Sequence, residues 1–212
     1  MPMHPKLTVV DHPLVAHKLS LMREKDTSTA RFRNLAREIG LLLGYEVLRD
    51  LPTEMREIET PMVRTSARFI KGKKVVFVPI LRAALGLVDG LLDLVPSARV
   101  GHVGIYREPE TLTAVEYFFK VPDDVAERPV VVISTVLASG NTAIAAISRL
   151  HEHGARDIKL VSLIAAPEGL AALARAYPDV PVFTAAVDER LDDQGFVMPG
   201  LGDAGDRMFG TR

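Results

Sequence analysis

The sequence predicts an α/β protein with a central, mostly parallel sheet that is covered by helices on both faces. Short aliphatic and β-branched runs alternate along the chain with amphipathic stretches of about 10–15 residues, which is the pattern of a parallel sheet with crossover helices. Residues 75–81 and 130–133 are continuously apolar, as expected for strands buried on both faces. The chain has 212 residues, of which 48% are hydrophobic, and this is enough for one domain with a substantial core.

The first expected elements lie in the N-terminal quarter of the chain. Residues 28–51 place apolar side chains at helical spacing, so we expect a long amphipathic helix there, inside a helical segment that covers about residues 11–51. Residues 57–64 resemble a strand with Pro61 at an edge or a bend.

The remaining elements alternate in type. The expected strands cover residues 74–81, 99–106, 130–133, 158–166 and 182–187. The expected helices cover residues 84–94, 143–150 and 168–176. Residues 107–121 are polar at first and then aromatic at Tyr117, Phe118 and Phe119, so we expect a projecting hairpin arm or lid. We interpret these three aromatic side chains as packing groups.

Composition narrows the class of protein. Lys and Arg total 26 and Asp and Glu total 27, so the overall charge gives no basic footprint for nucleic acid. The chain has no cysteine, and its histidines are scattered without ligand spacing, so we expect no metal site built from direct protein ligands. No signal-type N-terminus and no apolar run of membrane-spanning length stand out, which favours a cytoplasmic protein with no membrane partner. No repeat or linker divides residues 1–212, which we expect to form a single domain.

The most informative stretch is a strand, a turn and a helix start at residues 130–150. Ser139 and Thr142 offer hydroxyl donors, and Gly140 lets the backbone approach a ligand closely. The first N–H groups of the helix and its dipole would favour an anion at this turn. Taken alone, such a turn can also be a simple connection between a strand and a helix.

Two further features are expected at the same edge of the sheet, where ligands of parallel sheets bind. Arg82 follows the strand at residues 74–81, and its guanidinium could fork onto a pyrophosphate, although a lone arginine is more often a surface or salt-bridge residue. The tail at residues 197–207 contains three glycines and one proline, which predicts a loop with exposed backbone donors and acceptors. Such a loop can hold a flat polar base, and Leu201, Met208 and Phe209 would anchor it.

These residues resemble the uracil phosphoribosyltransferase family. The similarity runs from about residue 10 to residue 212, and the tail Pro-Gly-Leu-Gly-Asp-Ala-Gly-Asp-Arg at residues 199–207 is its most specific part. The other matching segments are residues 10–13, 79–83, 101–111, 165–169 and 188–191. The resemblance implies a type I phosphoribosyltransferase-like fold with a glycine-rich C-terminal hood at about residues 188–212. It also implies transfer of the phosphoribosyl group of phosphoribosyl pyrophosphate (PRPP) to uracil, giving UMP and pyrophosphate for pyrimidine salvage, with Mg²⁺ as cofactor.

The resemblance also implies roles for individual residues. Arg82 and Arg107 would bind the pyrophosphate, Arg107 from the mobile arm, and Asp203 would lie beside PRPP or its metal, which PRPP itself would carry. Val197, Gly202, Asp203 and Ala204 would hold uracil, largely through backbone groups. The stretch that would contact PRPP is Ser134, Thr135, Val136, Leu137, Ala138, Ser139, Gly140, Asn141 and Thr142. Asp188, Glu189 and Arg190 would lie near the site, and a homodimer or higher homo-oligomer is expected, with the aromatic arm as a candidate contact.

The chain departs from the family pattern at Ser134 and Thr135, where the family has aspartate and proline. The family aspartate accepts hydrogen bonds from the ribose hydroxyls, whereas Ser134 carries no charge. A hydrogen bond to a charged group contributes about 1.5–3 kcal/mol, so we expect weaker PRPP binding. Asn141 and Phe196 replace glycine and tyrosine and are milder changes.

Two functions therefore remain open at the level of sequence. The first is an active uracil phosphoribosyltransferase, favoured by the intact tail, Arg82 and Arg107. The second is a catalytically weakened member that binds uracil, UMP or PRPP in a regulatory or structural role, favoured by Ser134. A purine transferase fits less well, because those enzymes generally have an acidic pair before the phosphate turn. No Gly-x-Gly-x-x-Gly follows an early strand, which disfavours a nucleotide-binding oxidoreductase.

Overall fold

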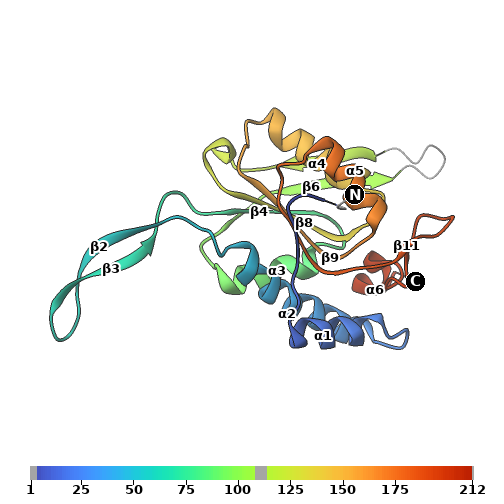
Figure 1. The fold of residues 1–212 in the computed structure, drawn as a ribbon, viewed down its shortest axis with the longest axis horizontal. Coiled ribbons are helices and arrows are strands. Elements are labelled where there is room, and N and C mark those ends of the chain that lie inside the picture. The colour runs from blue at the N-terminus through green and yellow to red at the C-terminus, as the bar shows by residue number, and fades with distance from the viewer. Residues whose placement is uncertain (1–3, 108–113, 212) are drawn as a thin grey trace.

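The protein has one large sheet sandwiched between two layers of helices (Figure 1). A computed structural model describes residues 4–107 and 114–211. The eight-stranded sheet has the order β1-β10-β9-β8-β4-β6-β7, and β5 pairs with β4. All its pairings are parallel except that of β6 with β7, so the expected α/β fold class is confirmed.

The elements of this body cover most of the chain. The strands of the large sheet are β1 (Leu7–Val9), β4 (Val76–Leu81), β5 (Arg99–Val100), β6 (His102–Arg107), β7 (Ala114–Lys120), β8 (Val130–Leu137), β9 (Ile158–Ala165) and β10 (Val182–Val187). The helices are α1 (Pro13–Arg23), α2 (Thr29–Val47), α3 (Leu85–Leu94), a 3-10 turn (Val125–Glu127), α4 (Asn141–Glu152), α5 (Pro167–Ala176) and α6 (Ala204–Phe209). The small strands β11 (Arg190–Leu191) and β12 (Val197–Met198) form a separate antiparallel pair.

Two apolar clusters lie on opposite faces of the sheet. One contains buried side chains of α1, α2, α3 and α6, such as Met22, Phe32 and Met208. The other contains buried side chains of α4 and α5, such as Ile147 and Leu170. Because successive strand residues point to opposite faces, Val131 and Ile133 of β8 join the first cluster while Val130 and Val132 join the second. The continuously apolar strands are thus explained by burial on both faces.

The N-terminal helical segment is confirmed and consists of α1 and α2. The Ser28 side chain caps α2 by accepting a hydrogen bond from the backbone N–H of Arg31 at 3.3 Å. The helix ends at Val47 rather than Leu51, and Phe32, Leu35 and Ile39 form its buried face.

The expected strand at residues 57–64 is wrong, because a turn lies in the middle of that range. The long hairpin of β2 (Thr53–Glu59) and β3 (Arg64–Ile70) projects far from the body, with its turn at residues 60–63 (Figure 1). Thr60 Oγ1 accepts hydrogen bonds from the N–H groups of Met62 and Val63, which closes the turn around Pro61. Pro61 therefore marks a reversal of the chain and not an edge strand.

The expected hairpin at residues 107–121 exists but belongs largely to the main sheet. β6 and β7 pair antiparallel, and residues 108–113 between them lie outside the described part of the chain. Phe119 packs as expected, with its ring centroid 4.4 Å from that of His153. Tyr117 and Phe118 are 54% and 45% exposed, so they do not belong to the core of this chain, and their predicted dimer contact stays a prediction. Within the described residues, the β2–β3 hairpin is a clear projection from the body (Figure 1).

Candidate active site

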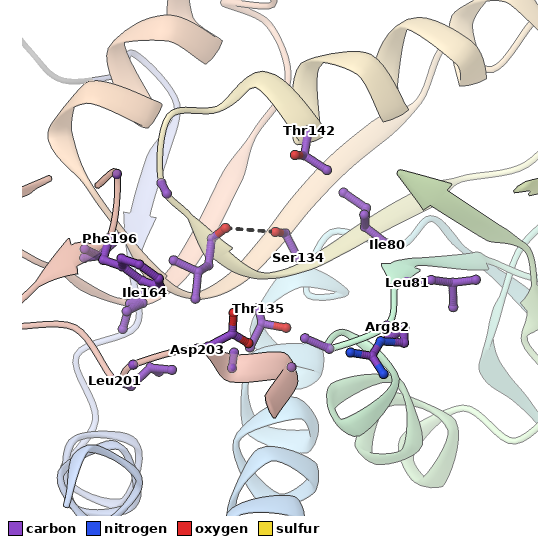
Figure 2. Close-up of a pocket in the computed structure, with 18 of the residues that line it drawn as sticks. Ile80, Leu81, Arg82, Ser134, Thr135, Thr142, Ile164, Phe196, Leu201 and Asp203 are labelled. Carbon is purple, nitrogen blue, oxygen red and sulfur yellow. Dashed lines mark hydrogen bonds between the residues drawn. The ribbon is translucent and has the colours of Figure 1, made fainter. Parts of the chain in front are cut away.

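A cavity of about 370 Å³ lies where the carboxyl ends of β4 and β8 meet the C-terminal tail. Its walls combine side chains from the sheet, from the turn before α4 and from the segment around α6 (Figure 2). The lining residues are Ile80, Leu81, Arg82, Ala83, Ile105, Ser134, Thr135, Val136, Ala138, Thr142, Ile164, Gly195, Phe196, Val197, Leu201, Gly202, Asp203, Ala204 and Gly205. This is the sheet edge at which the sequence predicted a ligand site.

The turn between β8 and α4 forms a smaller hollow of about 90 Å³ that shares Ser134, Ala138 and Thr142 with the cavity. Gly140 precedes α4 with a φ of +87°, and a Cβ there would lie 3.0 Å from the carbonyl oxygen of Gly169. Glycine is thus required both by the backbone conformation and by the close packing of α5. No side chain of the described residues caps α4, so its first N–H groups remain available to an anion.

The residues at the carboxyl end of β8 project from opposite sides of the strand (Figure 2). The Ser134 hydroxyl donates a hydrogen bond to the carbonyl oxygen of Val136 at 3.2 Å. Thr135 is only 4% exposed, and its Oγ1 has no hydrogen-bond partner among the described residues. Neither side chain carries charge, so the β8 edge of the cavity is neutral.

Arg82 supplies positive charge at the cavity wall. It follows β4 across a cis peptide bond, and its guanidinium carbon lies 5.6 Å from the centre of the Phe209 ring. Among the residues described, none forms an ion pair with Arg82, and the side chain is exposed. Arg107 ends β6, but its side chain lies outside what the structure describes.

The tail forms the wall opposite β8 and Arg82. We call residues 199–203, between β12 and α6, the tail loop. Gly200 and Gly202 adopt φ values of +66° and +75°, which favour glycine. Asp203 Oδ1 accepts a hydrogen bond from the N–H of Asp206 at 2.9 Å and so caps α6. Asp203 is also the one acidic side chain among the described residues that line the cavity.

Two arginine side chains behind the wall, Arg23 and Arg207, hold this loop, and the sequence did not predict the role of Arg23. Asp188 does not line the cavity; its buried carboxylate pairs with Arg23 of α1. Arg207 donates hydrogen bonds to the carbonyl oxygens of Leu201 and Glu24 at 2.8 and 2.6 Å. Burial lowers the pKa of Arg207 from its ordinary value. The Arg23–Asp188 pair joins residues 165 positions apart, and no local pattern could have indicated it.

The structure brings most of the predicted site residues together. Arg82, Ser134 to Val136, Ala138, Thr142, Val197 and Gly202 to Ala204 line the cavity. Leu137, Ser139 and Gly140 line the smaller hollow. Asn141 lines neither space, and Glu189 and Arg190 are exposed and pair with each other at 3.5 Å. The apolar wall residues Ile105 and Ile164 were not predicted as site residues, although each lies near the carboxyl end of a strand.

The described side chains that line the cavity offer too few oxygen or nitrogen ligands to hold a cation without a bound molecule. Within residues 4–107 and 114–211, no group of three His, Cys, Asp or Glu side chains could hold a metal ion. A cation at this site would therefore need oxygen ligands from a bound molecule in addition to the Asp203 carboxylate. Separately, no helix in the described parts of the chain has the length and apolar character needed to cross a membrane.

Comparisons with known proteins agree with this architecture. The uracil phosphoribosyltransferase from Bradyrhizobium diazoefficiens is 60% identical over 206 residues, covering 97% of this chain and 99% of that protein. The corresponding protein from Rhodococcus opacus is 59% identical over 204 residues, covering 96% of this chain and 98% of that protein. The solved structure of protein AQ2163 from Aquifex aeolicus matches with a TM-score of 0.92 at 38% identity, covering 97% of this chain and 98% of that one.

More distant structures share the fold alone. A hypoxanthine phosphoribosyltransferase from Staphylococcus aureus matches with a TM-score of 0.52 at 14% identity, covering 80% of this chain and 85% of that one. The sequence model of uracil phosphoribosyltransferase, in contrast, matches residues 9–211, which is nearly the whole chain. With the cavity between β8 and the tail loop, these findings show that the chain belongs to the uracil phosphoribosyltransferase family.

Proposed function

We propose that this chain, a pentosyltransferase by its family, transfers the phosphoribosyl group of PRPP to uracil and releases UMP and pyrophosphate. The observation that carries the proposal is one cavity that joins three kinds of wall. A helix N-terminus lies at one end, an exposed arginine at another, and a glycine-rich loop faces them. These walls match a phosphate, a pyrophosphate and a flat polar base.

The phosphate end of the site is the turn before α4. We assign the ribose 5-phosphate to the hollow formed by residues 137–142, with Ser139 and Thr142 as hydroxyl donors. The uncapped first turn of α4 supports this assignment, because its N–H groups and its dipole favour an anion. Thr135 and Ser134 would then lie beside the ribose.

The pyrophosphate would leave toward Arg82. A guanidinium can bind two phosphate oxygens at once, and Arg82 has no ion-pair partner within the described chain that would compete. We assign Arg107 to the same leaving group by its family position. Mg²⁺ bound to the pyrophosphate oxygens would neutralise further charge, with Asp203 as its neighbouring carboxylate.

The base would lie against the tail loop. Val197, Gly202 and Ala204 line the cavity beside Asp203, and their backbone groups can pair with the carbonyl and N–H groups of uracil. The apolar side chains of Ile164 and Leu201 would pack against the faces of the ring.

The chemistry needs positioning more than a covalent nucleophile. The C1–O bond to pyrophosphate breaks, a bond from C1 to uracil N1 forms, and the N1 proton leaves. Positive charge develops on the ribose and negative charge on the leaving group, so a fixed guanidinium stabilises the transition state. Exclusion of water would prevent hydrolysis of PRPP.

The decisive experiment incubates the protein with uracil, PRPP and Mg²⁺ and measures UMP by chromatography. Cytosine, hypoxanthine and orotate serve as matched base controls. UMP formation with uracil alone among the four bases supports the proposal. Absence of UMP while PRPP still binds, measured by calorimetry, would instead favour the second candidate, a catalytically weakened member that binds ligands in a regulatory or structural role. The neutral Ser134, with its hydroxyl turned onto Val136, is the observation that favours this alternative.

Assembly and location also remain proposals. We propose a homodimer. Its candidate contacts are the aromatic arm, where Tyr117 and Phe118 are exposed, and the projecting β2–β3 hairpin, where Met62 and Val63 are exposed. A monomer in sedimentation at micromolar concentration would reject this assembly. We propose a cytoplasmic location with no nucleic-acid partner, which cell fractionation and a filter-binding assay would check.

A further inference from the structure

A buried ion pair connects the N-terminal helix to the tail loop. Arg23 is the last residue of α1, and its two terminal nitrogens bind the two carboxylate oxygens of Asp188 at 2.8 and 2.6 Å. The Asp188 side chain is 3% exposed, and that of Arg23 is 24% exposed. Such a two-point pair fixes the direction of both side chains as well as their separation.

The same pair binds both backbone groups of Gly200. Asp188 Oδ2 accepts a hydrogen bond from the N–H of Gly200 at 2.9 Å. Arg23 Nη1 donates a hydrogen bond to the carbonyl oxygen of Gly200 at 2.6 Å. Gly200 is buried and lies directly before Leu201, Gly202 and Asp203, which line the cavity.

These contacts hold the tail loop at Gly200. It lies outside the β-ladder formed by β11 and β12, and Gly200 and Gly202 have positive φ values, so no regular secondary structure fixes the loop. At the other end of the loop, Arg207 donates hydrogen bonds to the carbonyl oxygens of Leu201 and Asp203, and the Leu201 side chain is buried. The buried side chains of Val15, Leu19 and Met22 fix the position of α1. Arg23, at the end of α1, therefore fixes the position of the cavity wall at Gly200.

Stability alone does not explain this arrangement. A buried ion pair can often be replaced by apolar side chains of similar size with little loss of stability. Apolar side chains cannot, however, bind the N–H and carbonyl groups of Gly200. The cavity wall, rather than the core, is thus the part of the protein that needs these two charges.

We propose that Arg23 and Asp188 are positioning residues that set the affinity of the site for the base. The inference rests on the proposed function, which assigns the tail loop to uracil. Loss of the pair would displace the backbone that holds the base while leaving the phosphate turn before α4 in place. The expected result is a selective rise in the KM for uracil.

The test uses the double variant Arg23→Met/Asp188→Leu, which removes both charges and leaves neither one buried alone. We expect a lower melting temperature, because the buried N–H and carbonyl groups of Gly200 lose their partners, together with an unchanged KM for PRPP and a fall of up to ~10²-fold in kcat/KM for uracil. Arg23→Lys provides a second, less disruptive variant, because it keeps the charge but loses the two-point fork. Its matched control is Arg128→Lys, at another arginine that forks onto an aspartate and donates to a carbonyl oxygen but lines no part of the cavity.

The outcomes separate the inference from the function on which it rests. A wild-type protein that forms no UMP overturns the proposed function itself. If the wild type is active, the positioning role is overturned by an unchanged KM for uracil in both variants. It is also overturned if Arg128→Lys raises the KM for uracil as much as Arg23→Lys does. Equal rises in the KM for uracil and for PRPP would overturn it as well, because they would indicate a general loss of structure.

Discussion

Replacing Arg82 by alanine tests whether this side chain contributes more to the reaction rate than to the stability of the fold. The side chain is exposed, and its contact with the Phe209 ring at 5.6 Å is the one cation–π contact recorded for it in the described structure. Exposed cation–π contacts contribute about 0.5–1 kcal/mol, so the free energy of unfolding should fall by no more than about that amount. Loss of a fixed donor to developing charge costs a rate factor of roughly 10²–10³, or about 2.7–4 kcal/mol.

The assay for Arg82→Ala pairs UMP formation under steady-state conditions with urea unfolding of the same preparation. We expect kcat/KM to fall by about two to three decades while the unfolding midpoint stays near that of the wild type. Phe209→Leu is the matched control, because it removes the ring and keeps the guanidinium, and it should retain turnover. A loss of less than about tenfold in Arg82→Ala, or a loss fully matched by destabilisation, would refute the role of this side chain.

Four further predictions concern the turn, the strand beside it and one distant carboxylate. Ser134→Asp should lower the KM for PRPP in steady-state kinetics, because it supplies the missing acceptor; a higher KM would contradict a contact with the ribose. Thr135→Val should raise the melting temperature, since an unpaired buried hydroxyl costs about 1–3 kcal/mol, and a fall in calorimetry would show that the hydroxyl is paired. Gly140→Ala should destabilise the protein by about 1–2 kcal/mol in urea unfolding, because it forces a side chain to a φ of +87°; wild-type stability would disprove this strain. The Arg128 and Lys73 side chains hold the pKa of Asp124 well below its ordinary value, so its stabilising effect is present at neutral pH and is lost in acid. Asp124→Asn should therefore be less stable than the wild type at pH 7, with the difference shrinking below a pH of about 4, and a difference independent of pH would exclude this linkage.

Hydrophobic pattern was sufficient to predict the central part of the fold. The strands β4, β8, β9 and β10 are apolar runs that the sheet buries on both faces, and their ranges agree with prediction to within a few residues. The expected strand at residues 99–106 is divided at Gly101, where a Cβ would lie 2.8 Å from the Val121 side chain. This division reflects a tertiary contact that no local pattern reveals.

The β2–β3 hairpin was missed for a different reason. Its strands stand away from the core and carry charged side chains such as Arg56, Glu57 and Arg68, so apolar alternation is weak. Without a buried face, the sequence leaves only the turn at Pro61 as a signal, and that signal was assigned to the wrong element.

The site was predictable to the extent that it lies in local motifs. The turn at residues 139–142 and the tail were recognised from their glycine and hydroxyl residues, and the structure brings both to one cavity. The Arg23–Asp188 pair could not be predicted, because the two residues meet only through the packing of α1 against the hood. Arg82 was assigned from its position after β4, and its freedom from ion pairs within the described chain became visible only in three dimensions.

Because the tail loop lies near the C-terminus, its side of the cavity is synthesised after the phosphate turn. The turn at residues 139–142 leaves the ribosome about 60 residues before Gly200, because the chain is made from its N-terminus. A nascent chain can therefore shape the anion pocket while the opposite side of the cavity is still missing. The tail-loop wall of the cavity forms last, when Gly200 binds the carboxylate of Asp188 and the guanidinium of Arg23. A protease cut between Asp192 and Phe196 would break the chain between Asp188 and Gly200. It would cut no strand of the eight-stranded sheet.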